Sequence, residues 1–168
     1  MPILNPDHFF DQAEKLASSP LTGTVRQVDL RRAISSAYYG LFHFVLTAAA
    51  DEFVGVTRRS RGQYTLLYRS IDHRTLKDLC IDVAKQNPPR RYASYVPSGF
   101  DANVLAFADA AVELQERRHI ADYDPQPRFR TADAKLAVEM ARSAIERFKR
   151  AKREHRRDFL ILLLCPPR

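Results

Sequence analysis

Five charged or aromatic side chains lie close together at the end of one predicted helix, in the stretch "LQERRHIADYDP". They are Arg117, Arg118, His119, Asp122 and Tyr123. When the apolar face of this helix is continued at helical spacing, Arg118 and Asp122 fall on the inward side. An arginine can neutralise a phosphate and a histidine can transfer protons, but a carboxylate four residues on is also the nearest counter-ion. The pattern therefore predicts either a functional site or an internal ion pair.

A second polar stripe runs along an earlier apolar helix. Arg32, Ser36, Tyr39 and His43 are spaced four, three and four residues apart, so Arg32 and His43 differ by only about 20° around the axis. A lone histidine in such a helix is more often a core residue than a catalyst. Buried polar side chains nevertheless require hydrogen-bond partners, which two inward polar stripes can supply to each other. We therefore expect Arg118 and Asp122 to form a pair that lines a cleft with Arg32 or Tyr39.

Helical periodicity covers most of the 168 residues, and no stretch shows the alternation of a strand. The chain is predicted to be one domain, residues 1–168, folded as an all-α, antiparallel bundle of four to five helices. The expected helices are one after an Asn5 cap, one from about Asp29 to residue 53, two at about 63–70 and 73–84, one capped by Ser98, and one from about Thr131. Small residues on the last helix, Ala137, Ala141 and Ala144, would let another helix approach closely.

The net charge of +7 is concentrated near the C-terminus, because residues 146–157 hold seven Arg or Lys and two Glu. We expect a basic helix extension over about 146–164. Such a run is typical of a solvated helix face, but it also suits phosphate binding. A proline-rich loop at 87–99 adds arginines beside tyrosines, which suits single-stranded bases. The candidate nucleic-acid-binding residues are Arg32, Tyr39, Arg90, Arg91, Tyr92, Arg150 and Arg153.

Together, "RRAISSAYYGLFH" (31–43) and "RRHIADYDP" (117–125) resemble the HEPN superfamily over about residues 9–148. In that family a helix with two tyrosines faces a helix that ends in an arginine-rich motif. The resemblance implies a helical bundle and a homodimer. It further implies a metal-independent endoribonuclease that acts on RNA, as the toxin of a toxin–antitoxin or defence system with a nucleotidyltransferase partner as antitoxin.

The motif differs from that of the active HEPN ribonucleases at one position. Arg118 matches the motif arginine and Tyr123 the trailing tyrosine, but Asp122 stands where those enzymes carry histidine. Cleavage without metal needs a base, an acid and a cation for the phosphorane charge. Arg118 would supply the cation, and His43 or His119 would have to transfer the protons, because a paired aspartate is a weak base and no acid at neutral pH. A non-catalytic module that binds RNA, nucleotide or a partner protein, and a purely structural subunit, stay open as alternatives.

The sequence contains no motif for a nucleotide-binding loop or a metal site. The five glycines make no phosphate-binding loop, and the histidines show neither metal-ligand spacing nor a neighbouring carboxylate set, so neither a metal nor a cofactor is expected. The longest apolar run, "FLILLLC", is far shorter than the ~20 residues of a membrane span. Two unpaired cysteines, Cys80 and Cys165, suggest a reducing compartment, and we expect a cytoplasmic protein without membrane contact.

Overall fold

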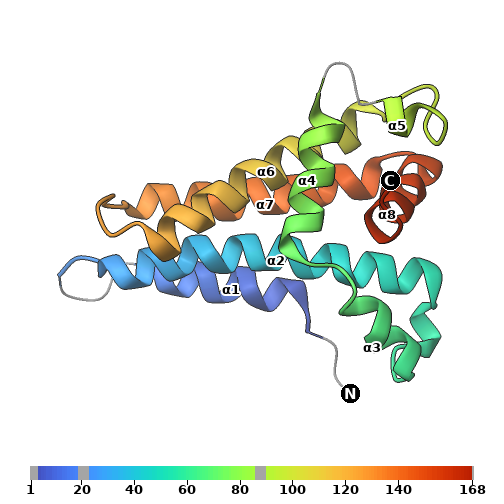
Figure 1. The fold of residues 1–168 in the computed structure, drawn as a ribbon. Helices are drawn as coiled ribbons and strands as arrows, with labels where there is room; N and C mark the ends of the chain where they lie inside the picture. The colour runs from blue at the N-terminus through green and yellow to red at the C-terminus, as the bar shows by residue number, and fades with distance from the viewer. Residues whose placement is uncertain (1–3, 19–22, 86–89, 168) are drawn as a thin grey trace.

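The computed structural model describes residues 4–18, 23–85 and 90–167, which contain eight α-helices, one 3-10 turn at Val56–Arg58 and no strand (Figure 1). The all-helical prediction is confirmed. The helices are α1 (Pro6–Ala17), α2 (Gln27–Phe53), α3 (Gly62–Tyr68), α4 (His73–Ala84), α5 (Arg90–Ala93), α6 (Ala102–Tyr123), α7 (Thr131–Arg150) and α8 (Arg153–Leu164).

Helix α2 is the centre of the fold, since it packs against α1, α6 and α7, and α6 packs against α7. Figure 1 shows that α1 and α6 run in one direction and that α2 and α7 run in the other. Helix α4 crosses α6 and closes one side of the bundle. The apolar side of α2 lies in the core: Leu30, Ile34, Ala37, Tyr38, Leu41 and Val45 are all buried.

Two helix starts illustrate how local sequence sets the element boundaries. Asn5 caps α1 as predicted, because its side chain accepts a hydrogen bond from the Asp7 amide at 3.0 Å. The predicted Ser98 cap of α6 is wrong. Asp101 is the cap instead, since its carboxylate accepts hydrogen bonds from the backbone amides of Asn103 and Val104. A loop was predicted at 87–99, but residues 90–93 form the short helix α5. Residues 87–89 of that loop lie outside the described residues.

The basic helix extension expected over about 146–164 is helical at 146–150 and 153–164, but it is broken into two helices. Helix α7 ends at Arg150, Ala151 adopts an extended conformation with ψ 153°, and α8 folds back against the bundle. The physical reason is the apolar end of α8, where Phe159 is 0% exposed. Its ring lies 5.6–6.2 Å, centre to centre, from the rings of Phe100, Phe107 and Phe148. A straight extension would leave these apolar side chains in water.

The small residues of α7 pack against other helices of the same chain. Ala137, Ala141 and Ala144 are at most 2% exposed. They allow the close approach that the sequence predicted, but the approaching helices belong to the same bundle. This stripe is therefore closed to a second copy of the chain.

A glycine allows α1 to approach α2. A Cβ added at Gly40 would stand 2.6 Å from the ring of Phe10, which is itself only 1% exposed. No side chain other than hydrogen fits there without moving the ring. Gly40 thus fixes the separation of α1 from α2, the helix that carries Tyr39 and His43.

Helix α2 is also long and apolar enough to cross a membrane, as judged by length and composition. Its most apolar window is 72% buried against the rest of the protein. Such burial is that of a core helix, and it agrees with the central position of α2 in Figure 1.

Candidate functional site

Arg118 and Asp122 form the predicted ion pair on the last turns of α6. The Nε atom of Arg118 lies 2.8 Å from Oδ2 of Asp122, and the two side chains are 15% and 19% exposed. The N–H direction does not meet hydrogen-bond geometry, so the contact is electrostatic. The backbone of Asp122 is open to solvent at the helix end, whereas its carboxylate is shielded.

Three tyrosines surround the guanidinium of Arg118. Its Nη2 donates a 2.9 Å hydrogen bond to the hydroxyl of Tyr39 on α2. Its central carbon also lies 5.5–5.9 Å from the ring centres of Tyr38, Tyr39 and Tyr123, within the range of cation–π attraction. Burial opposes the charge, but the Tyr39 hydrogen bond and the negative charge of Asp122 outweigh it and raise the pKa of Arg118. The arginine is therefore charged and held in place.

The carboxylate of Asp122 has a second partner that the sequence analysis missed. Ser35 on α2 is buried, and its hydroxyl donates a short hydrogen bond to Oδ1 of Asp122. One carboxylate oxygen thus faces Ser35 and the other faces Arg118. The arrangement joins α2 and α6 through a network in which both charges are compensated.

Arg31 fixes the chain just beyond the motif. Its guanidinium donates hydrogen bonds to the carbonyls of Ala121 (3.0 Å), Asp124 (2.6 Å) and Pro127 (2.6 Å), and it lies 5.2 Å from the ring centre of Phe129. The end of a helix has carbonyls without intrahelical partners, and prolines in the following loop supply no amide to satisfy them. A cation from α2 fulfils this need.

Gln27, one turn before Arg31, extends this attachment. Its side-chain amide donates to the carbonyl of Phe129 at 2.7 Å and accepts from the amide of the same residue at 2.9 Å. Two-way bonding of this kind fixes the direction of the loop as well as its position. The first turns of α2 thus define where the Arg118 motif ends.

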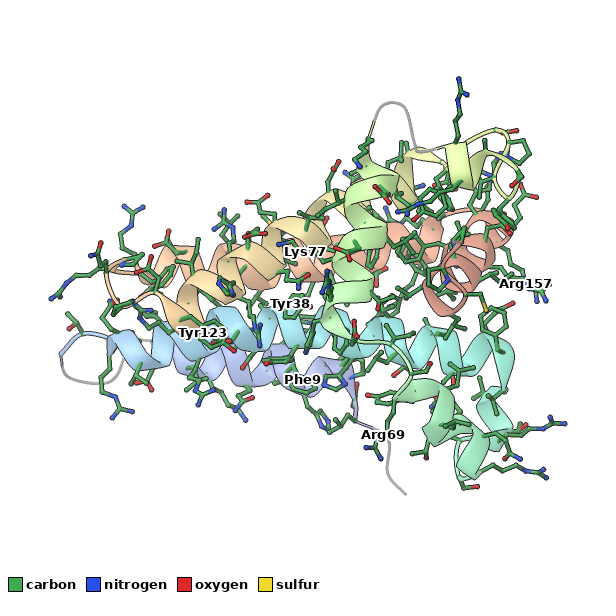
Figure 2. All side chains as sticks on the ribbon, in the orientation of Figure 1. Phe9, Tyr38, Arg69, Lys77, Tyr123 and Arg157 are labelled. Carbon is green, nitrogen blue, oxygen red and sulfur yellow. The ribbon has the colours of Figure 1, made fainter. Side chains whose placement is uncertain are left out.

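Two histidines lie beside Tyr39. The ring centre of His43, on α2, is 6.5 Å from that of Tyr39, and the ring centre of His73, on α4, is 5.7 Å from it. His43 Nδ1 is hydrogen-bonded to the hydroxyl of Tyr68 at 2.7 Å, and His73 Nδ1 to that of Tyr38 at 2.8 Å. Figure 2 labels Tyr38 and Phe9 in this central region of the bundle.

Both histidines favour the neutral form. Burial lowers the pKa of His43, and the nearby His73 lowers it further. Burial also lowers the pKa of His73, with an additional contribution from the positive charge of Arg118 that outweighs the opposing effect of Asp72. A neutral imidazole can accept a proton, so each histidine is suited to the role of a base.

Other residues of the predicted site lie elsewhere. Arg32 is exposed, and Ser36 faces α1, where its hydroxyl is 3.4 Å from the amide oxygen of Gln12. His119 is exposed on the outer side of α6, with its ring 5.0 Å from that of Tyr123. The structure therefore brings Tyr39, Asp122 and Tyr123 to Arg118, with His43 close to Tyr39, while Arg32 and His119 point away from this centre.

The arginine–tyrosine loop has a structural use. Asp82 accepts hydrogen bonds from Arg91 and Tyr92, and Tyr92 is 6% exposed. A buried ring offers no face to a nucleic-acid base, so the stacking role predicted for Tyr92 does not fit this position. Arg90 is exposed beside it.

The basic residues near the C-terminus are separated by the break at Ala151. Arg150 is exposed at the end of α7, and Arg153 is exposed at the start of α8. Figure 2 shows Arg157 of α8 toward one end of the bundle and Tyr123 toward the other. In the described part of the chain, no group of three His, Cys, Asp or Glu side chains has the geometry of a metal site.

The comparisons with known proteins leave the family open. No protein-family model, no curated protein sequence and no solved structure matches this chain. The HEPN resemblance accordingly rests on the two sequence motifs alone.

Proposed function

We propose that this protein is a HEPN-like module that acts on RNA, and that Arg118 and its neighbours form a metal-independent endoribonuclease site. The observation that carries the proposal is the position of Arg118, which is charged, hydrogen-bonded to Tyr39 and close to two neutral histidines. A fixed, largely buried cation is what a developing phosphorane charge requires.

The proposed reaction uses the 2′-hydroxyl of the RNA as the nucleophile. His73 or His43 accepts its proton while the 2′-oxygen bonds to phosphorus and the 5′-oxygen of the next nucleotide leaves. The products are a 2′,3′-cyclic phosphate and a 5′-hydroxyl end. Arg118 stabilises the extra negative charge, and a proton must be delivered to the leaving oxygen. Tyr39 is the candidate for this acid, because its hydroxyl is hydrogen-bonded to Arg118, whereas His119 lies on the outer side of α6.

A second function, binding without cleavage, is favoured by Asp122. Its carboxylate is engaged by Ser35 and Arg118, so it neutralises the arginine that would otherwise face a phosphate. In this case the motif joins two helices, and the protein binds RNA, a nucleotide or a partner protein through another surface. The choice between the two functions depends on whether a substrate phosphate can displace Asp122 from Arg118.

The decisive experiment measures cleavage of a broad panel of RNAs in the presence of EDTA. We expect cleavage by the natural chain, loss in Arg118→Ala, and a decrease of about a hundredfold or more in His43→Gln or His73→Gln. Arg117→Ala is the matched control, since this neighbouring arginine pairs with Glu113 on the exposed side of α6. Cyclic-phosphate ends on the products would identify the chemistry.

Asp122→His tests the alternative. Cleavage created or increased by this change would show that the natural chain is a binding module that lacks the proton-transfer group. Absence of both cleavage and RNA binding in the natural chain and in Asp122→His would contradict both RNA functions.

The partners implied by the resemblance belong to the same proposal. Ile120 and Tyr123, 38% and 65% exposed, are the apolar side chains beside the motif that a homodimer would cover, in place of the buried stripe of α7. Light scattering at tens of micromolar would test the dimer. Co-purification with a nucleotidyltransferase would test the toxin–antitoxin assignment.

A further inference from the structure

Basic side chains from two helices converge on a groove of about 260 Å³ between α2, α7 and α8. We call it the basic groove and define it by Lys149, Arg153, Arg156 and Arg157, with Phe44 of α2 on its apolar wall. The break at Ala151 creates it, because the fold-back of α8 brings Arg153, Arg156 and Arg157 to the same opening as Lys149.

The basic groove has a positive charge that its own partners do not cancel. Asp51 on the α2 wall is already bound by Arg59, at 2.9 Å between Nε and Oδ1. Glu52 lies 3.7 Å from Arg157, and Glu146 lies 2.8 Å from Lys149. The four cations of the groove and Arg59 thus have three carboxylates near them, Asp51, Glu52 and Glu146, which leaves an excess of two positive charges.

Arg153 is the most available of these cations. Its side chain makes no ion pair or hydrogen bond with the residues that the structure describes, and it is exposed. An exposed arginine without a counter-ion presents a planar set of donors that matches a phosphate.

The apolar wall points to the class of anion. Phe44 is half-buried, and Lys149 Nζ lies 5.9 Å from its ring centre. Cations beside an aromatic ring are the combination that single-stranded nucleic acids use, with phosphates on the cations and a base against the ring. The volume is slightly below the range of drug-sized pockets, which suits one nucleotide unit rather than a larger ligand.

We propose that the basic groove binds single-stranded RNA, with a backbone phosphate on Arg153 and Arg157 and a base against Phe44. The proposal rests on the proposed RNA-directed function and adds a second contact region to it. Tyr39 lies at the Arg118 site and Ala48 lines the basic groove, and the two residues are nine positions apart on α2. This spacing is about 14 Å along the axis and half a turn around it, so the groove opens on a different side of α2 from the Arg118 site.

The main test compares two double variants of the full-length chain. The probe is a fluorescein-labelled 12-nucleotide oligouridylate, and anisotropy is measured over a salt series. Arg153→Ala with Arg157→Ala should weaken binding about tenfold at low salt and reduce the salt slope by about 0.7, the value for one phosphate contact on a single strand. Arg61→Ala with Arg69→Ala is the control, because these exposed arginines lie outside the groove and carry the same charge.

A gain-of-function variant makes the test independent of folding. Glu52→Gln removes the carboxylate beside Arg157, and we expect tighter binding of the probe at low salt. Glu139→Gln, on an exposed position of α7, should leave the affinity unchanged. Circular dichroism of each variant verifies that the helical fold is retained.

Several outcomes would overturn the proposal. Equal weakening by both arginine pairs would show a diffuse basic surface, and no tightening in Glu52→Gln would remove the charge argument. Displacement of the probe by uridine monophosphate as effectively as by unlabelled oligouridylate would assign the groove to free nucleotides, and equal displacement by polyglutamate would assign it to acidic proteins. The proposed function fails separately, if the natural chain binds RNA through the groove but does not cleave it.

Discussion

Arg118 donates its 2.9 Å hydrogen bond to Tyr39 across 79 positions of sequence, which joins the end of α6 to the middle of α2. The acceptor is a hydroxyl on the central helix of the fold, and the ring of the same tyrosine lies within cation–π range of the guanidinium. The position of the arginine therefore depends on the packing of α2 against α6. It does not depend on the local sequence of the motif alone.

Loss of Asp122 should destabilise the fold more than loss of an exposed carboxylate. In Asp122→Ala the shielded charge of Arg118 and the hydroxyl of Ser35 both lose their partner, and we expect a loss of about 3 kcal/mol, the low end for a broken buried pair. Urea denaturation measures it. The control is Glu113→Ala, which breaks an exposed pair with Arg117 at the same spacing and should cost about 0.3–0.5 kcal/mol. Equal losses in the two variants would show that the inner pair has no special role.

Acidification should destabilise the protein through His43 and His73. Burial lowers the pKa of both in the folded state, so the unfolded chain binds more protons once the pH falls below about 6.5. The stability present above that value should decrease as the pH falls to the lowered pKa values and then level off. Urea titrations between pH 7.5 and 5 should show this, with a slope of at most about 1.4 kcal/mol per pH unit for each histidine.

Replacement of His73 should remove part of this dependence. His73→Gln eliminates one shielded imidazole, and His119→Gln removes a histidine from the exposed side of α6 as the matched control. A shallower pH dependence in the first variant alone is expected. An unchanged slope in His73→Gln would contradict the assignment.

Helix α8 should prove necessary for stability. Phe159→Ala removes a fully buried ring from a cluster of phenylalanines and should cost about 3–5 kcal/mol. Ile161→Ala, on the same helix but 39% exposed, is the control and should cost far less. Truncation after Glu146 would remove Phe148 and Phe159 together, so it would unfold the protein and would not isolate the effect of the basic charges. Cooperative unfolding at the same urea concentration with and without α8 would contradict this view.

Gly40→Ala should destabilise although alanine favours helices. The methyl group would meet the buried ring of Phe10 at 2.6 Å, and such overpacking costs about 1–3 kcal/mol. Thermal unfolding measures the loss, and Gly62→Ala is the control, because no atom lies within 4 Å of a Cβ added there. An increase in melting temperature for Gly40→Ala would show that α1 moves away easily.

Periodicity was sufficient to predict the helices but not the face of α2 that meets α6. Of the predicted stripe Arg32, Ser36, Tyr39 and His43, Tyr39 bonds Arg118, but Arg32 and Ser36 do not reach the site. Their neighbours Arg31 and Ser35 contact the end of α6 instead. One position changes the direction of a side chain by about 100°. Arg31 and Ser35 have the same four-residue spacing as Arg32 and Ser36, so only the packing of α6 against α2 shows which pair faces it.

Other features were hidden because they depend on distant contacts. His73 follows the Asp72 cap of α4, so its sequence context indicates only a helix start. Its position beside Tyr38 results from the way in which α4 packs across the bundle. The break at Ala151 was missed for a similar reason, since the need to bury Phe159 overrides a strongly helical basic run.

The attachment by Arg31 has a consequence for how the protein opens. The guanidinium of Arg31, near the start of α2, is bonded to the carbonyls of Ala121, Asp124 and Pro127 at and just beyond the end of α6. Fraying of either end would therefore break these bonds. Isolated helix ends normally exchange their amide hydrogens fastest. Here the two ends should exchange slowly and at a common rate, as a single cooperative unit, and the surroundings of Arg118 would then be among the most rigid parts of the chain.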